Sequence, residues 1–126
     1  MKSPSIGVED VYAIHVRSIE MFGGTDGVRD VGLLESAVAQ PWQTFDGSEL
    51  YPTSEEKACR LAFGIVSNHP FVDGNKRTGA ACLGAALRMS GFDFSPDPSD
   101  FLNVMLSLAS GELGYEQLFD WVRRQI

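Results

Sequence analysis

The sequence predicts an all-α fold, a compact bundle of about six helices. Apolar residues recur at helical spacing along most of the chain, and the one segment that alternates like a strand, residues 92–94, is too short to carry a sheet. Glycines and prolines separate the periodic segments at intervals that suit helices. At 126 residues the chain predicts a single domain over 1–126, which buries enough apolar surface to fold without a disulfide or a metal.

The first part of the chain predicts two helices and an irregular connection. A helix over residues 8–22 is ended by the glycine pair 23–24. A second helix covers residues 31–40, where Pro41 stops it. Residues 41–53 contain prolines and a glycine without a clear period, and we expect them to be irregular. The apolar positions that define the first helix are Val8, Val11, Tyr12, Ile19 and Phe22.

The middle of the chain predicts the two helices at the centre of the bundle. Thr53 or Ser54 is expected to cap a helix over residues 54–68, because either side chain accepts a hydrogen bond from the first turn. The next helix is expected from about residue 76 to residue 90, with Gly91 as its cap. Small residues on nearly every side of this helix indicate that its neighbours approach closely all round.

Two more helices are expected after the prolines that follow the central pair. Ser99 or Asp100 is expected to cap a helix that runs to Ala109. Glycines then separate it from a last helix over residues 115–125.

Composition excludes several classes of protein. A net charge of −7 and a pI near 4.6 argue against a general nucleic-acid binder, because affinity for a phosphate backbone requires an extended basic face. Neither a signal peptide nor an apolar run long enough to span a membrane is found in the sequence. Cys59 and Cys82 have no metal-ligand spacing and are expected to be small buried residues in a reducing compartment. We therefore expect a soluble cytoplasmic protein whose phosphate contacts are local.

Chemistry-bearing residues are concentrated in the run His-Pro-Phe-Val-Asp-Gly-Asn-Lys-Arg-Thr-Gly at residues 69–79. The unperturbed pKa of histidine lies near neutrality, so His69 is a candidate base. Asp73 supplies hard carboxylate oxygens of the kind that bind Mg²⁺ together with phosphates. A histidine in this position is more often a packed or capping residue when it stands alone, and an aspartate more often stabilises a turn.

The same run also carries the elements of an anion site. Asp-Gly-Asn is strong turn sequence, and Gly74 permits a backbone conformation in which successive N–H groups point at one anion. Lys76 and Arg77 stand where the next helix is expected to begin, so cations and the positive end of the helix dipole converge. Together with His69 and Asp73, these features predict phosphoryl chemistry of an unspecified kind.

The motif His-Pro-Phe-x-Asp-Gly-Asn-Lys-Arg resembles the signature of the Fic/Doc superfamily, whose members move part of a nucleotide onto a protein hydroxyl. The Fic branch has Gly where this chain has Lys76 and a second Arg where it has Ala80, and both departures are shared with the Doc (death-on-curing) branch. Residues 23–38 and 49–53 also look like Doc-type sequence.

The resemblance implies a role for each motif residue. His69 would accept the proton of the attacking hydroxyl, and Asp73 would be a Mg²⁺ ligand. Phe71 is expected to anchor the loop structurally. The residues expected to bind nucleotide or phosphate are Gly74, Asn75, Lys76 and Arg77.

The resemblance also implies an activity. In the Doc branch a lysine at position 76 goes with a nucleotide pose that presents the γ-phosphate, so the expected protein is a kinase toxin using Mg²⁺ with ATP. Its target would be a Ser or Thr hydroxyl of a cytoplasmic translation factor, such as elongation factor Tu, and a cognate antitoxin would hold it by a C-terminal segment. Two alternatives remain: Fic-type transfer of AMP or another nucleotide-derived group, and a non-catalytic module that only binds a partner.

Three further expectations concern residues outside the motif. His15 is expected to be a core or interfacial histidine without a catalytic role. Arg29 and Asp30 are expected to form internal salt bridges or to anchor a loop. Residues 51–53 are expected to contribute to a flap over the target peptide, because loops beside a rigid platform often bind partners.

Overall fold

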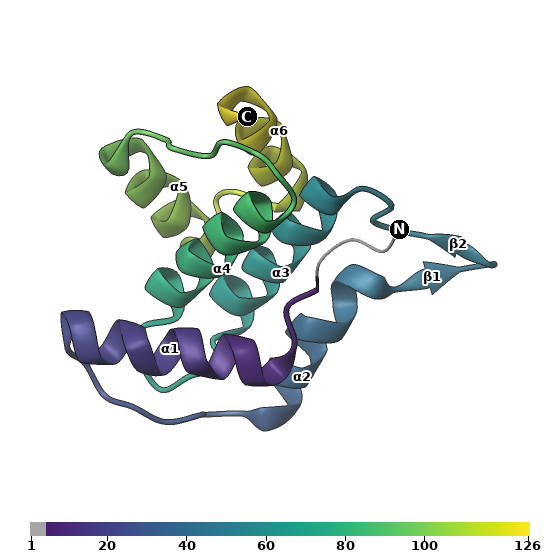
Figure 1. The fold of residues 1–126 in the computed structure, drawn as a ribbon. Helices are drawn as coiled ribbons and strands as arrows, with labels where there is room; N and C mark the ends of the chain where they lie inside the picture. The colour runs from purple at the N-terminus through teal and green to yellow at the C-terminus, as the bar shows by residue number, and fades with distance from the viewer. Residues whose placement is uncertain (1–4) are drawn as a thin grey trace.

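The computed structural model of the protein describes residues 5–126, and this part of the chain confirms the all-α fold (Figure 1). Six α-helices are accompanied by one 3₁₀ turn and one very small antiparallel hairpin. Their bounds are α1 Val8–Phe22, α2 Val31–Ala39, η1 Gln40–Trp42, β1 Thr44–Phe45, β2 Ser48–Glu49, α3 Ser54–Asn68, α4 Asn75–Met89, α5 Pro98–Ser110 and α6 Tyr115–Gln125.

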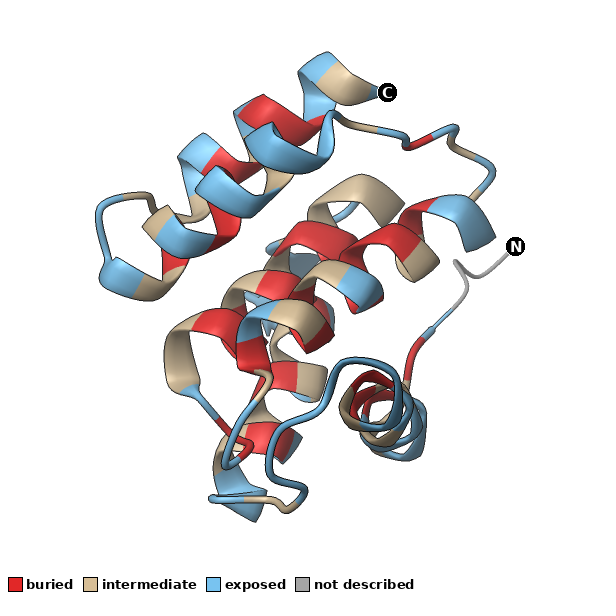
Figure 2. Cartoon of the chain, turned by 90° about the vertical axis from the view of Figure 1, so that its left-hand side faces the viewer, coloured by how far each residue is buried: buried red, intermediate tan, exposed pale blue. Residues whose placement is uncertain are grey.

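Helices α3 and α4 form an antiparallel pair at the centre of the molecule. In Figure 1, α1 and α2 cover one side of this pair, and α5 and α6 cover the other. Each side has its own core cluster. Val11, Leu34, Ile65 and Phe71 belong to the cluster under α1 and α2, and the cluster under α5 and α6 includes Trp121. Figure 2 shows many of the buried positions on the central helices.

Small residues let the central helices approach their neighbours, as the composition of α4 indicates. A side chain at Gly79 of α4 would collide with Val66 of α3, and one at Gly64 would lie 3.0 Å from the Cβ of Ala37 in α2. These contacts fix α3 and α4 against each other, so the loop that joins them, residues 69–74, is held at both ends by rigid helices.

Most of the expected helix ends agree with the structure, and Thr53 is the N-cap of α3. Its hydroxyl accepts from the Glu56 N–H, and the Glu56 carboxylate accepts from the Thr53 N–H, which is a capping box. Helix α4 begins at Asn75 and ends at Met89, so Ser90 and not Gly91 is its C-cap.

Two local expectations are wrong. Helix α5 is capped by Asp97, whose carboxylate accepts from the Asp100 N–H, because Pro98 occupies the first helical position, where its missing N–H costs nothing. Residues 41–53 are not wholly irregular, since β1 and β2 pair Thr44 with Glu49 across a turn at Asp46–Gly47. Figure 1 shows this hairpin projecting from the body of the molecule.

Both cysteines are buried and unpaired, as their surroundings in the sequence predict. Burial raises the pKa of the Cys82 thiol to about 12 and that of Cys59 well above its usual range. Thiols in this state are poor nucleophiles and pack as small apolar groups. Among residues 5–126 no helix combines the length and the hydropathy needed to cross a bilayer.

Candidate active site

The α3–α4 loop begins and ends on residues with left-handed backbone conformations. His69, the C-cap of α3, has φ 52° and ψ 58°, and Gly74, the N-cap of α4, has φ 76° and ψ 20°. Glycine adopts this conformation without strain, whereas a residue with a Cβ pays on the order of 1 kcal/mol. The candidate base therefore occupies a strained position that its surroundings must hold.

Arg29, from the loop between α1 and α2, holds the backbone of His69 in this conformation. Its Nε donates to the carbonyl oxygen of His69 at 2.7 Å, and its Nη2 donates to that of Asn68 at 2.8 Å. These are carbonyls at the end of α3, where a helix leaves acceptors without intrahelical partners. Of the two roles expected for Arg29, the structure thus shows loop anchoring.

The ring of His69 is oriented by its own helix end. Its Nδ1 lies 3.2 Å from the carbonyl oxygen of Ser67. Because a carbonyl only accepts, Nδ1 carries the proton of that hydrogen bond, and in the neutral ring Nε2 keeps its lone pair. This tautomer presents Nε2 as the atom that can take a proton from a hydroxyl.

Phe71 and Asn75 fix the interior of the loop. Phe71 is 1 % exposed, and Asn75 is buried beside it. The amide side chain of Asn75 accepts from the Phe71 N–H and donates to the Phe71 carbonyl, both at 3.0 Å. Both polar atoms of this side chain thus hold the backbone of Phe71 in place, and the Asn75 N–H lies in the first turn of α4.

His15 supports the loop from α1. It is fully buried, and its ring stacks on that of Phe71 with centroids 3.9 Å apart and an interplanar angle of 4°. Its Nε2 donates to the backbone carbonyl of Asp73 at 2.7 Å, while Nδ1 lies 3.7 Å from a carboxylate oxygen of Asp26. The expected core histidine is thus a buried support of the motif, a role that no local sequence pattern assigns.

Each oxygen of the Asp73 carboxylate accepts a hydrogen bond although the side chain lies at the surface. Thr25 N–H donates to its Oδ2 at 3.1 Å, and Gly74 N–H donates to its Oδ1 at 2.8 Å. These two hydrogen bonds lower the pKa of Asp73, and the bond from Thr25 contributes most. The charges of Arg77 and His15 lower this pKa further, whereas partial desolvation of the carboxylate opposes the shift. The carboxylate is therefore anionic at neutral pH, as a cation ligand must be.

Lys76 and Arg77 occupy the first turn of α4, where N–H groups have no intrahelical acceptor and the helix dipole is positive. The guanidinium of Arg77 donates from Nη2 to the Gly23 carbonyl at 3.0 Å and lies over the Phe22 ring, 5.6 Å from its centroid. Lys76 is exposed. The structure thus brings a histidine, a carboxylate, two cations and a helix N-terminus into one loop and one helical turn.

A metal in this loop would depend on oxygen atoms from elsewhere. In the described part of the chain no three His, Cys, Asp or Glu side chains gather into a metal cluster. One anionic carboxylate suits Mg²⁺, which usually keeps several waters and binds phosphates, whereas it does not suit a metal that needs an all-protein cage. The donor set therefore fits a cation that arrives with a nucleotide.

Comparison with known proteins identifies this arrangement. Residues 5–87, which span α1 to most of α4, match the model of the Fic/DOC family. The chain belongs to the Fic/Doc family.

Curated relatives of this Fic/Doc chain carry Doc names. It is 43 % identical over 76 residues to the "Toxin Doc" of Mycolicibacterium smegmatis, an alignment that covers 60 % of this chain and 58 % of that protein. It is 27 % identical over 119 residues to the "Protein kinase doc" of Escherichia phage P1, covering 94 % and 93 % of the two chains. The alignment with the first relative thus spans less than two thirds of its length, and both relatives support the Doc branch of the family.

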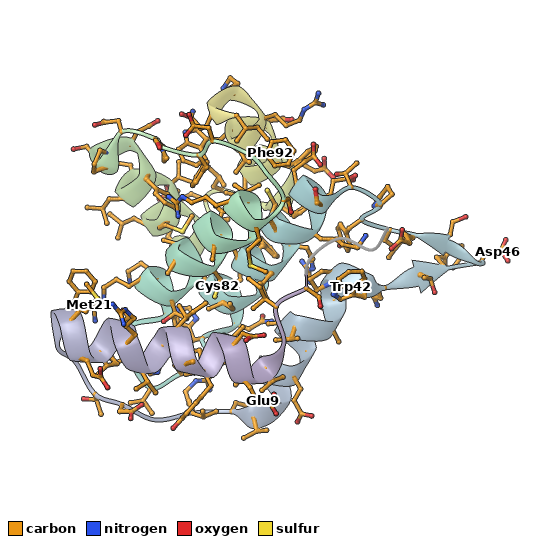
Figure 3. All side chains as sticks on the ribbon, viewed as in Figure 1. Glu9, Met21, Trp42, Asp46, Cys82 and Phe92 are labelled. Carbon is orange, nitrogen blue, oxygen red and sulfur yellow. The ribbon has the colours of Figure 1, made fainter. Side chains whose placement is uncertain are left out.

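An apolar groove adjoins the Fic/Doc motif. It has a volume of about 760 Å³ and lies between α1, α4 and α5. Arg17, Lys76 and Arg77 contribute the charged part of its lining. The exposed apolar residues Met21, Phe22 and Leu102 belong to its walls, and Met21 marks the C-terminal end of α1 in Figure 3.

Residues 51–53 lie at the other end of α3 from the Fic/Doc motif, and their expected part in a flap over the target peptide stays a prediction. They precede the N-terminus of α3, whereas His69 caps its C-terminus, and a helix of 15 residues is roughly 22 Å long. Lys57 holds this segment in place: its ammonium donates to the Tyr51 carbonyl, pairs with Glu49 at 2.9 Å and lies 4.9 Å from the centroid of Trp42. The loop that does contact the motif is residues 23–30.

Proposed function

We propose that the protein is a Doc-type toxin that transfers the terminal phosphoryl group of ATP to a Ser or Thr hydroxyl of a cytoplasmic protein. The observation that carries the proposal is the tautomer of His69. Its Nδ1 donates to the Ser67 carbonyl, so Nε2 is the ring atom with a free lone pair. His69 also belongs to the same short loop as the anionic Asp73. A base beside a cation ligand, at the N-terminus of a helix, is the arrangement that phosphoryl transfer needs.

In this proposal each side chain has one task. Nε2 of His69 removes the proton of the attacking hydroxyl as its oxygen bonds to the γ-phosphorus, the bond from that phosphorus to the β–γ bridging oxygen breaks, and ADP leaves. Asp73 holds Mg²⁺, which when bound offsets the negative charge of the phosphates. Arg77, Lys76 and the N–H groups of the first turn of α4, with Gly74 preceding them, bind phosphate oxygens.

Lys76 supports transfer of the terminal phosphoryl group over transfer of AMP. A long cationic side chain here narrows the space along the loop in which a glycine would let the phosphates extend. The relative from Escherichia phage P1, which aligns over 94 % of this chain, is named a protein kinase. By the same analogy the acceptor is a translation factor, with elongation factor Tu as the first candidate.

The apolar groove favours regulation by an inhibitor protein that binds in it, because a contiguous apolar hollow with a charged end is typical of an interaction site. An amphipathic helix of a cognate antitoxin would place apolar side chains between α1 and α5 and an acidic side chain near Arg17, Lys76 and Arg77. Bound there, the helix would compete with nucleotide for the two motif cations. One segment would thus both stabilise the toxin and block it.

Incubation with ATP labelled at either the γ- or the α-phosphorus, in a cell lysate, tests the proposed reaction. We expect a labelled protein band from γ-labelled ATP and none from α-labelled ATP. Transfer of the α-label alone would show nucleotidyl transfer and would refute the kinase.

The His69→Ala variant separates catalysis from binding. Loss of a general base costs about 10²- to 10⁴-fold in rate, so the variant should no longer arrest growth when it is expressed. Growth arrest that persists at the wild-type level would show that the protein acts by binding a partner.

A further inference from the structure

The loop that leaves α1 passes directly beside the two side chains to which the proposed function gives the metal and the phosphates. Gly23 is the C-cap of α1 with φ 82°, and Gly24 follows with φ 115°. In Figure 1 this loop leaves the C-terminal end of α1 and returns beneath that helix to α2. Residues 23–25 are exposed, so burial does not determine their path.

Backbone groups of this segment bind both side chains. Thr25 N–H donates to Oδ2 of Asp73 at 3.1 Å, and the Gly23 carbonyl accepts from Nη2 of Arg77 at 3.0 Å. These hydrogen bonds span 48 and 54 residues of sequence. Because the partners are main-chain groups, the position of the two side chains follows the course of the loop rather than the identity of its side chains.

A side chain at Gly24 would meet both Asp73 and Arg77. A Cβ added there would lie 2.6 Å from Oδ2 of Asp73 and 3.3 Å from Nη2 of Arg77. An ordinary carbon–oxygen contact is longer than the first distance by several tenths of an ångström, so the carboxylate would have to move. By contrast, a Cβ at Gly91, where φ is similarly positive at 93°, would meet nothing within 4 Å.

The following residues fix the register of the loop against the motif. Val72 N–H donates to the Gly27 carbonyl at 3.0 Å, and Val28 forms an antiparallel bridge with Phe71. The N–H groups of Arg29 and Asp30 both donate to the Pro70 carbonyl, at 2.7 and 3.0 Å. With these bonds in place, the segment before them has little freedom to move away from Asp73 and Arg77.

We propose that residues 23–25 are a positioning element of the phosphoryl-transfer site, which sets the carboxylate of Asp73 and the guanidinium of Arg77 at their working separation. The inference rests on the proposed roles of Asp73 and Arg77, and it adds that Gly24 is required there because any side chain displaces the carboxylate. Two side chains that are already held in place lose less conformational entropy on binding than two mobile surface side chains would.

The test compares Gly24→Ala with Gly91→Ala, which imposes similar backbone strain away from the site. Binding of ATP with Mg²⁺ is measured by calorimetry without a target protein. We expect Gly24→Ala to weaken the affinity for ATP at least tenfold, which corresponds to about 1.4 kcal/mol. A higher Mg²⁺ concentration should restore part of this affinity. Gly91→Ala should bind ATP within about twofold of the wild type. Equal affinities of the two variants would overturn the inference.

Hydrogen exchange of the Thr25 amide, measured without nucleotide, gives a second readout. The bond to Asp73 should slow this exchange in the wild type, and Gly24→Ala should accelerate it at least tenfold with little change at amides in α6. Unchanged exchange at Thr25 would overturn the inference as well. A wild-type protein that does not bind ATP with Mg²⁺ would refute the proposed function instead, and the exchange measurement would still decide whether the loop positions Asp73.

Discussion

The motif loop and the apolar groove meet at Lys76 and Arg77, but they are organised in opposite ways. In the loop, Phe71 is 1 % exposed, and hydrogen bonds from α1, the α1–α2 loop and α4 hold the backbone from residue 68 to residue 74. In the groove, Phe22 and Leu102 are 65 % and 56 % exposed. The region to which we assign chemistry is complete within this chain, whereas the apolar surface beside it is left uncovered.

Burial and hydrogen bonds are thus concentrated in the motif loop, whereas the apolar groove is left exposed and free to bind a partner. A preorganised loop holds the reacting groups in position, so no conformational entropy is lost in ordering them at each turnover. An exposed apolar surface lowers its free energy only when something covers it. Substitutions in the loop should therefore affect folding and activity together, whereas substitutions at exposed apolar positions of the groove, such as Leu102, should affect partner binding alone.

Phe71→Ala should have the largest effect. Removing a buried aromatic side chain costs about 3–5 kcal/mol, and here the stacking partner of His15 is lost as well. The free energy of unfolding, measured by urea denaturation, should fall by this amount. Phe45→Ala is the matched control, because Phe45 is 74 % exposed and its loss should change stability by less than about 0.5 kcal/mol. Similar losses in both variants would show that the loop is not the stabilised region.

Asn75→Ala comes next. The substitution leaves the buried N–H and carbonyl of Phe71 without partners, and each unsatisfied group costs about 1–3 kcal/mol. The expected result is a lower denaturation midpoint and faster hydrogen exchange at residues 71–74. Asn103→Ala, at an exposed position in α5, should leave both measurements unchanged. If Asn75→Ala were as stable as the wild type, the comparison between loop and groove would fail.

Leu102→Asp tests the groove. Burying a carboxylate against the apolar side chains of a bound helix is unfavourable, so affinity for a neutralising antitoxin should fall about tenfold or more, which is about 1.4 kcal/mol. Leu106→Asp, one turn further along α5 and 46 % exposed but outside the groove, is the control. Both variants should keep the wild-type melting temperature. An equal loss of neutralisation in growth assays would locate the inhibitor elsewhere.

The change expected from His69→Gly is the smallest free-energy difference of the four, and its sign is the informative part. Glycine relieves the left-handed conformation at φ 52°, so the variant should be more stable than His69→Ala by about 1 kcal/mol. Both variants lack the base, so both should lose transfer of labelled phosphate. A His69→Gly variant no more stable than His69→Ala would mean that the loop stores no strain at its candidate base.

Much of the fold could be predicted from the sequence because its signals are local. The helices 8–22 and 115–125 begin and end as expected, since periodicity and flanking glycines act within a few residues. The hairpin at Thr44–Glu49 and the Asp97 cap were missed although local signals existed. Asp46–Gly47 is a hairpin turn pair, and a proline at the first helical position places the cap one residue earlier.

The composition of the candidate site was predictable, but its supports were not. The motif residues are contiguous, so their types alone indicate phosphate chemistry. The contacts of His15, Gly24 and Arg29 join segments separated by 40 or more residues, and no local pattern reports such proximity.

The two hydrogen bonds from Arg29 to the end of α3 also have a consequence for the order of events during folding. Helices α3 and α4 are neighbours in sequence, so we expect their hairpin to form early, whereas docking of the α1–α2 loop requires closure over about 40 residues and should come later. Until it docks, the chain would contain the motif without an oriented base or carboxylate. A newly made molecule would thus be inactive until this docking step, whatever the state of its central helices.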